Sequence, residues 1–585
     1  MNAPLVRSVC LRFPLLTLLT LLLGGWYQAN APGPSDVPPP IIRVNTRLVL
    51  VDVVVTDKQG KPVPALSRED FAVEESGKPQ KISVFETPRP TQLPAAPALP
   101  PGIYSNRAEF RSPGGPIVVL LLDAVNTPFK DQAYARRQML RFVQEQYKPG
   151  QRMAIYTLTD SLRVLQDFTS DPQVLYTALQ HYLPEPQRLA SANQPKTSLA
   201  SGAPTASSTA IALEASTPPS TASGGDASLR PGGTGTTTQN AIQLFESTSV
   251  AYQLDQRKVI TLDALNALAR TLGGMHGHKS IIWVTAELPF SLIPENSAYS
   301  EAQLAEDMPS LGVHKLDQRS SGSMAAISRG SNAEEIRETA SRLSNAQIAI
   351  YPVDARGLSI ATDSDSQELM REMASETGGR AYVNQNEIQD GVARAFADSS
   401  VTYTVGYYPE NKKWDGKYRP IKMKVQRDGL EVRYRRGYYA IDLTQVKGYK
   451  PDQEVASTLR DAVPATLVAF TARVVPPTAN SAKGKLGVDF LVDAGTVSAE
   501  DASNGKKLNI AFYTYTFSSA GKILGNRSMK VDQTFDANTF QQILQKGLLL
   551  HMDLDPAPAG ASLRLAVQDN RTGMVGSLEA PAPAQ

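Results

Sequence analysis

Uninterrupted apolar runs of strand length, followed by helical segments, constrain this chain more than any other feature. Residues 116–122, 280–284 and 348–353 are three such runs, dense in Val, Ile and Leu. A strand that is apolar on both faces must be buried on both faces, as in a parallel sheet covered by helices. Helical spacing of leucines, as at 261–272, separates the runs. The sequence therefore predicts an α/β domain with a mostly parallel sheet and helices on both faces.

Shorter elements complete this α/β domain, which we predict to span residues 113–408. Two stretches interrupt it, 190–240 and 291–330, and the first consists almost entirely of Ala, Ser, Thr, Gly and Pro. Such a composition cannot bury enough apolar surface to offset the entropy lost on ordering, so we expect both stretches to be flexible insertions. The remaining helices are expected at 130–146, 333–345, 367–377 and 388–399, and the remaining strands at 153–158, 162–165, 380–383 and 401–407.

Segments with alternating apolar and polar residues flank the α/β domain. Residues 41–87 predict a small β unit, and residues 409–442 predict a β extension around the Asp428-Gly429 hairpin turn. Residues 88–112 are rich in Pro and Ala, which is typical of a linker. Residues 455–585 alternate again and predict a C-terminal antiparallel β-sandwich.

The N-terminus has the pattern of a secretory signal peptide over residues 1–31. Arg7 and Arg12 precede an apolar run at 13–23, and Ala29-Asn30-Ala31 has the form of a cleavage site. An uncleaved membrane anchor is the alternative; no later segment is apolar enough to span a bilayer. Cys10 is the only cysteine and would leave with the signal, which excludes a disulfide or thiolate site in the mature chain. We predict an exported protein, periplasmic or extracellular.

Charge excludes nucleic acid as a predicted partner. The 59 basic and 57 acidic residues give a net charge of +2, without the basic excess that such partners require. The one local cluster, Arg433, Arg435 and Arg436 beside tyrosines, is interpreted as a solvated strand face covering a tyrosine-lined core.

Several phrases give the chain its resemblance to a known family. The first apolar strand closes on Leu121-Leu122-Asp123, and further matching phrases lie at 53–57, 70–71, 77–82, 121–127 and 432–439. Together with the order of elements, they resemble the von Willebrand factor A (VWFA)-related proteins typical of Acidobacteria, over about residues 42–442. The resemblance implies a Rossmann-like von Willebrand A domain and a binding site at the carboxyl ends of its strands.

The resemblance also implies a site for a divalent ion, with a D-x-S-x-S loop after the first strand. Asp123 and Thr127 match this loop, but Val125 stands where the middle serine would be, and Asn126 offers an amide oxygen one position away. Thr261 is the candidate for the threonine of a second loop. These four oxygen-bearing residues, Asp123, Asn126, Thr127 and Thr261, are the predicted binding residues.

A complete metal site lacks ligands in this sequence. Ala286 occupies the place where the family has an aspartate, and Glu287 next to it is the available substitute. Asp123, Thr127 and Glu287 are thus the candidate ligands, for Mg²⁺ or Ca²⁺, which prefer oxygen. The alternative is that Asp123 binds no ion and instead accepts hydrogen bonds from backbone amides of its own loop, which the short ligand count favours.

The sequence holds no recognisable catalytic motif. Residues 273–280 differ from a phosphate-binding loop because they end a helix and open a strand. His276 and His278 lack partner ligands and are interpreted as a solvated loop pair. We therefore predict a non-enzymatic module that binds an unknown protein at the strand carboxyl ends. A structural envelope or matrix component is the alternative, and an unrecognised hydrolase ranks lowest.

Overall fold

The computed structural model describes residues 48–59, 61–87, 98–110, 117–147, 152–184, 234–275, 277–292, 321–358, 364–398, 402–447, 449–476 and 485–583. The predicted signal peptide, residues 1–31, lies outside the described residues. All described residues belong to one unit, Arg43–Gln585. Among them, no helix is both long and apolar enough to cross a membrane.

A mixed five-stranded sheet lies at the centre of the α/β part, with the strand order β10-β9-β6-β7-β8. The first four of these strands are parallel and buried at every position, as the apolar runs predict. The fifth, β8, turns back antiparallel to β7 and forms the edge. The bounds are β6 Ile117–Asp123, β7 Met153–Leu158, β8 Leu162–Thr169, β9 Lys279–Thr285 and β10 Ile348–Asp354.

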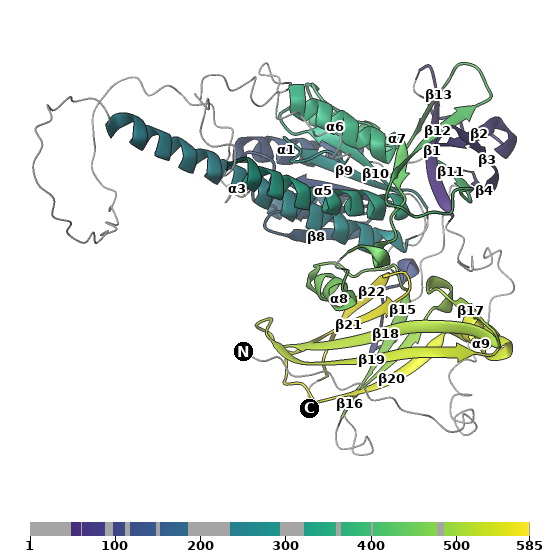
Figure 1. Ribbon diagram of the computed structural model, residues 1–585. Helices are drawn as coiled ribbons and strands as arrows, with labels where there is room; N and C mark the ends of the chain where they lie inside the picture. The colour runs from purple at the N-terminus through teal and green to yellow at the C-terminus, as the bar shows by residue number, and fades with distance from the viewer. Residues whose placement is uncertain are drawn as a thin grey trace, which may run out of the picture. The chain divides into compact units, whose positions relative to one another are not determined.

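Helices cover both faces of this sheet (Figure 1). Val119 and Leu121 of β6 pack with α3, α5 and α6, whereas Leu120 and Leu122 pack with α1, α2 and α7. Alternate side chains of one strand thus enter opposite cores, which explains the unbroken apolar runs. The bounds are α1 Phe129–Arg141, followed by a π-helical turn at Phe142–Gln146, α2 Pro172–His181, α3 Thr234–Gly273, α5 Ser321–Asn345, α6 Ser364–Thr377 and α7 Ile388–Asp398.

Three sequence predictions for this part need correction. The expected insertions 190–240 and 291–330 end too late, because α3 begins at Thr234 and α5 at Ser321; most of the rest of both stretches lies outside the described residues. No strand forms at 380–383, where Tyr382 makes only an isolated bridge to Val353. Residues 401–407 do not extend the central sheet, because their strand pairs elsewhere.

That strand, β11, joins the two flanking β segments into one module. It lies between β1 and β4 in the sheet β13-β1-β11-β4, and a second sheet has the order β14-β12-β2-β3. The two sheets share one apolar core that includes Val51, Val73, Tyr403 and Met423. The bounds are β1 Val49–Asp57, β2 Phe71–Glu75, β3 Lys78–Gln80, β4 Ile82–Glu86, β11 Tyr403–Tyr407, β12 Tyr418–Val425, β13 Leu430–Tyr434 and β14 Gly437–Tyr439.

The C-terminal part consists of two antiparallel sheets around a common core. One has the order β20-β16-β15-β5, and the other contains β17, β18, β21 and β22, with β19 paired to β18. The bounds are β15 Phe470–Val475, β16 Leu486–Val492, β17 Glu500–Ala502, β18 Gly505–Phe517, β19 Ile523–Phe535, β20 Leu548–Leu554, β21 Ser562–Asp569 and β22 Val575–Pro581, with helices α8 Pro451–Arg460 and α9 Ala537–Lys546.

Residues 88–112 were expected to be a linker. This prediction is wrong for Ile103–Ser105, which form strand β5 and pair with β15. Asn106 explains why the segment is held. Its fully buried side chain donates to the carbonyls of Ala465 and Val468 and accepts from the amide of Phe470. A polar side chain without access to water must find such partners, so Asn106 anchors β5 beside β15.

Buried ion pairs connect α8 with the helices of the α/β part. Glu454 accepts two 2.9 Å hydrogen bonds from Arg342 of α5. Arg270 of α3 lies 3.4 Å from Glu454 and donates through Nε to Asp461 at 2.9 Å. These charges, all less than one fifth exposed, hold the segment that leads into the C-terminal sheets.

Candidate binding site at the rim of the central sheet

The predicted binding residues meet where β6 and β9 end. Asp123 is the last residue of β6 and Thr285 the last of β9, and the two parallel strands are neighbours. Their carboxyl ends therefore lie at one edge of the sheet, where ligands of open α/β sheets bind. A hydrogen-bonded network at this edge contains Asp123, Asn126, Thr261 and Glu287, and Thr127 bonds to the backbone of Ala286 beside it.

Asp123 is buried, with 3% of its surface exposed, and four donors surround its carboxylate. Oδ1 accepts from the backbone amide of Asn126 at 2.9 Å. Oδ2 accepts from the Asn126 side chain at 2.9 Å, from the indole of Trp283 at 3.0 Å and from the hydroxyl of Thr285 at 3.0 Å. Burial raises the pKa of this carboxyl above its ordinary value, and the hydrogen bonds oppose the rise. The hydrogen bond from the Asn126 amide is the local backbone contact that the sequence predicts for Asp123.

Arg257 of α3 supplies the positive charge of the network. Its Nε donates to Oδ1 of Asn126 at 2.9 Å, and one terminal nitrogen donates to Oε2 of Glu287 at 2.9 Å. Only 6% of its side chain is exposed. The Arg257 guanidinium thus bridges Asn126, a predicted binding residue, and Glu287, a predicted metal ligand.

The two threonine hydroxyls of the site are also engaged within the protein. Thr127 Oγ1 accepts from the amide of Ala286 at 3.1 Å. Thr261 Oγ1 accepts from the Asn126 side chain at 3.1 Å and donates to the carbonyl of Arg257 at 2.7 Å. Across the described part of the chain, no three His, Cys, Asp or Glu side chains gather as they would around a metal ion.

Sequence reasoning missed Arg257 and Trp283. Arg257 precedes Thr261 by one helical turn, but residues 234–257 resemble no clear amphipathic helix, so nothing in the sequence directs attention to it. Trp283 sits inside an apolar run, where its indole N–H is a concealed donor.

A second carboxylate at the same edge is neutralised in a similar way. Asp354 ends β10 and is 3% exposed. The side chain of Arg356, two residues on, donates to both of its oxygens at 2.9 Å. Two exposed apolar side chains follow strands that end at this edge: Phe129, at the start of α1 after β6, and Leu358, in the loop after β10. The loops at this edge therefore combine exposed apolar side chains with buried, internally paired polar ones.

A separate polar cluster lies at the opposite, amino end of β9. His278 Nδ1 is 2.8 Å from Oδ2 of Asp52, and His278 Nε2 is 3.0 Å from Oγ of Ser280. Asp52 Oδ1 accepts from Thr404 at 2.8 Å and from Gln347 at 3.1 Å. Hydrogen bonding and the charge of His278 lower the pKa of Asp52 even though its burial opposes this. The prediction of a solvated histidine pair is wrong for His278, while His276 lies outside the described residues.

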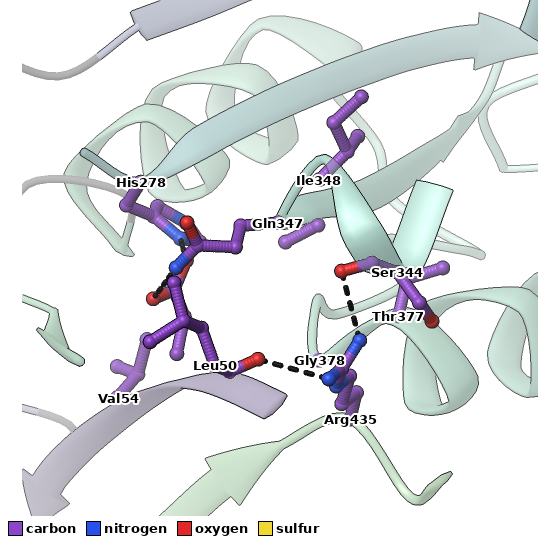
Figure 2. Close-up of a pocket in the computed structure, with 11 residues that line it drawn as sticks. Leu50, Val54, His278, Ser344, Gln347, Ile348, Thr377, Gly378 and Arg435 are labelled. Carbon is purple, nitrogen blue, oxygen red and sulfur yellow. Dashed lines mark hydrogen bonds and ion pairs between the residues drawn. The ribbon is translucent and has the colours of Figure 1, made fainter. Parts of the chain in front are cut away.

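The cluster borders a cavity of about 20 Å³ between β1 and the α/β part (Figure 2). Arg435 faces it from the other side and donates to the carbonyls of Ser344 and Leu50 at 2.9 Å. Arg435 is 9% exposed, and Arg433 pairs with Asp398 at 2.8 Å. These two arginines are therefore not part of a solvated face, which corrects their interpretation from the sequence.

Comparisons with known proteins leave the family open. No protein-family model matches the chain, and no curated protein matches it. Among solved structures, an aerotolerance-related membrane protein from Bacteroides fragilis with multiple mutations to serines is 12% identical; the match covers 48% of this chain and 99% of that one, with a TM-score of 0.20. An endonuclease/exonuclease/phosphatase from Beutenbergia cavernae is 10% identical over 32% of this chain and 38% of that one, with a TM-score of 0.12. The human COPII-coat protein Sec24c is 9% identical over 65% and 53%, with a TM-score of 0.18. These scores are too low to support an argument about fold or function.

Proposed function

We propose that this chain is an exported, non-enzymatic protein-binding module. Its α/β part has a von Willebrand A-like fold, and its C-terminal sheets form a β-sandwich. The partner docks at the rim where the carboxyl ends of β6, β9 and β10 meet. The observation that carries this proposal is the convergence of Asp123, Asn126, Thr127, Thr261 and Glu287 at the sheet edge where the exposed Phe129 and Leu358 follow β6 and β10.

Binding at this rim needs no metal ion in our proposal. An ion would have to replace four donors at Asp123 and the guanidinium between Asn126 and Glu287. Arg257 already supplies a positive charge within the network, and it cannot dissociate as an ion can. The buried charges keep the rim loops in one arrangement, and the apolar side chains above them contact the partner.

Hydrolysis is the enzymatic alternative, because Ser280, His278 and Asp52 have the spacing of a Ser-His-Asp relay. Ser280, however, lies on a central strand and is 0% exposed. The neighbouring cavity, about 20 Å³, holds no more than one water molecule. We therefore assign the cluster a structural role: it joins β1 of the β module to β9 of the central sheet.

A structural envelope or matrix component is the other alternative, in which the C-terminal sheets make the contacts and the rim makes none. The buried ion pairs of Arg270, Arg342, Glu454 and Asp461 favour it, because they make a rigid connection to those sheets. Variants at the rim separate the two proposals, since only the binding module requires the rim.

The test compares capture of partners from an envelope extract by three forms of the purified protein. The rim variant carries Phe129→Ser and Leu358→Ser, which are 52% and 63% exposed in the parent. The control carries Val164→Ser and Val174→Ser on β8 and α2, which are 36% and 38% exposed. Any partner captured by the parent is then purified and its Kd measured.

We expect the rim variant to weaken binding by about tenfold or more, because centrally placed apolar contacts dominate interface energies. The control binds like the parent, and EDTA changes neither result. Equal binding by all three forms would refute the rim as the docking site. Loss of binding in EDTA would refute the proposed independence from metal.

A further inference from the structure

We propose that two copies of this chain associate by antiparallel pairing of their β19 strands. The proposal rests on the free edge of β19 and on the order of charges along it. Strand β19, Ile523–Phe535, is more than twice the usual strand length and pairs on one side only, with β18, among the described residues. Its other edge presents unpaired backbone N–H and C=O groups, which favour addition of a further strand.

Exposure distinguishes β19 from the longer strands of its sheet, β18, β21 and β22. Its first eight residues, 523–530, are all exposed, whereas β21 is buried or half-buried throughout. Ile523, Leu524 and Met529 are 52%, 47% and 37% exposed and are three of the eleven large apolar side chains that are exposed among the described residues. The edge is therefore both unpaired and partly apolar.

The two faces of β19 can be assigned from its contacts. Val531 and Phe535 pack against the core between the two C-terminal sheets. Alternation along a strand then places Lys530 and Asp532 together on the outer face, where their side chains are 54% and 37% exposed. Within the chain, Asp532 contacts Lys507 of β18 at 3.1 Å and Lys530 at 3.4 Å, and both pairs are exposed enough for salt to screen them.

A two-fold axis through Val531 gives this edge a self-complementary register. When two copies continue one sheet, residues on the same face must lie opposite each other, so the axis passes through a residue. An axis at Val531 sets Lys530 of each copy opposite Asp532 of the other, with residues 527–535 paired. Met529 lies inside this register, whereas Ile523 and Leu524 lie outside it. An axis at Lys530 or at Asp532 instead sets like charges opposite each other, which is unfavourable.

A lysine on an edge strand usually prevents such pairing. Here the acidic residue two positions later, on the same face, converts the lysine into part of a matched pair. The chemistry therefore fits a second copy of this strand better than an uncharged extended segment from another protein.

The test is a charge exchange measured by sedimentation of the purified protein over a range of concentrations. Lys530→Asp sets two aspartates opposite two aspartates in a homodimer, and Asp532→Lys sets lysines opposite lysines. We expect each variant alone to dimerise more weakly than the parent, by about tenfold or more. An equimolar mixture of the two variants restores both ion pairs, so we expect heterodimers of parent-like affinity.

Lys412→Asp, an exposed lysine in the β module, carries the same change of charge and serves as the matched control. It is expected to dimerise like the parent. Circular dichroism of each variant verifies that the exposed substitutions leave the fold intact. The proposal is overturned if the parent stays monomeric at every concentration, or if mixing the two variants restores nothing.

Discussion

Nε of Arg257 donates a 2.9 Å hydrogen bond to Oδ1 of Asn126, and the same guanidinium reaches Glu287. A helix residue thus links the loop after β6 to the loop after β9. Both acceptors belong to the predicted site. We therefore expect the Arg257 side chain to hold these two loops in position.

Arg257→Met is expected to lower the free energy of unfolding by about 2 kcal/mol, because it leaves Asn126 and Glu287 without their charged donor. Urea denaturation gives the value. Arg371→Met is the matched control, since Arg371 is 49% exposed and pairs with Glu368 on the surface. Equal effects of the two substitutions would contradict the role given to Arg257.

Removal of divalent ions is expected to leave the stability unchanged. A ligand that binds only the folded state stabilises it by RT ln(1 + [L]/Kd), so adding an ion that binds would raise Tm. We expect the same Tm in EDTA, in Mg²⁺ and in Ca²⁺, because protein donors already surround Asp123. A rise in Tm on adding either ion to chelated protein would argue against this arrangement.

His278→Ala is expected to destabilise the protein by about 2–3 kcal/mol. The substitution leaves the Asp52 carboxylate, 10% exposed, with only the neutral donors Thr404 and Gln347. His551→Ala should change the stability little, since His551 is 54% exposed beside Asp489 and Asp553. Urea denaturation of both variants at one pH makes the comparison, and similar losses in the two would rule out a special role for His278.

The same cluster gives a prediction about reactivity. Because Ser280 is fully buried, a fluorophosphonate reagent should not label it in the native protein, although His278 lies 3.0 Å away. Mass spectrometry of the reacted protein decides the point. Native-state labelling that Ser280→Ala abolishes would revive the hydrolase alternative.

The ion pairs at α8 predict opposite pH responses for two neighbouring acids. Burial raises the pKa of Asp461 from 3.8 to about 6. The folded state therefore holds this proton more tightly than the unfolded state, and stability falls as pH rises from about 4 to 6. The stability of the parent relative to Asp461→Asn should fall by about 3 kcal/mol across this window.

Glu454 behaves in the opposite sense. The pKa of Glu454 lies below its ordinary value of 4.5: burial alone would raise it, but the charges of Arg342 and Arg270 outweigh burial. Its stabilisation is present above pH 4.5 and is lost as pH falls through the folded pKa. Relative to Glu454→Gln, the parent should therefore lose stability on acidification, as measured by urea denaturation at a series of pH values. A parallel response of the two variants would contradict the assignment.

The apolar runs predict the central sheet well because a strand that is buried on both faces must be apolar at nearly every position. Val119 and Leu121 enter one core while Leu120 and Leu122 enter the other, so the whole run must be apolar. The position of Asp123 at the end of such a run places it at the sheet edge by the same argument. The hydrogen bond from the Asn126 amide was also predictable, because it is local.

Contacts between distant segments leave no such record. The pairing of β5 with β15 depends on Asn106, a polar residue in a region that resembles a linker. Arg257 and His278 look like ordinary surface residues in the sequence, yet each is buried against partners from other segments, Glu287 and Asp52 among them. Secondary-structure propensity and hydrophobic periodicity depend on residues that are neighbours along the chain. The contacts of Asn106, Arg257 and His278 join distant segments, so these signals do not predict them.

The route of the backbone has a consequence for biosynthesis. Asp52 meets Thr404, which is 352 residues later, and Ser105 meets Phe470, which is 365 residues later. The early strands can therefore pair only after their partners, more than 350 residues later, have been synthesised. Contacts between residues so far apart in sequence also slow folding. A nascent chain that leaves the ribosome early, or a product of premature termination, would present orphan strands to chaperones and proteases instead of a smaller working protein.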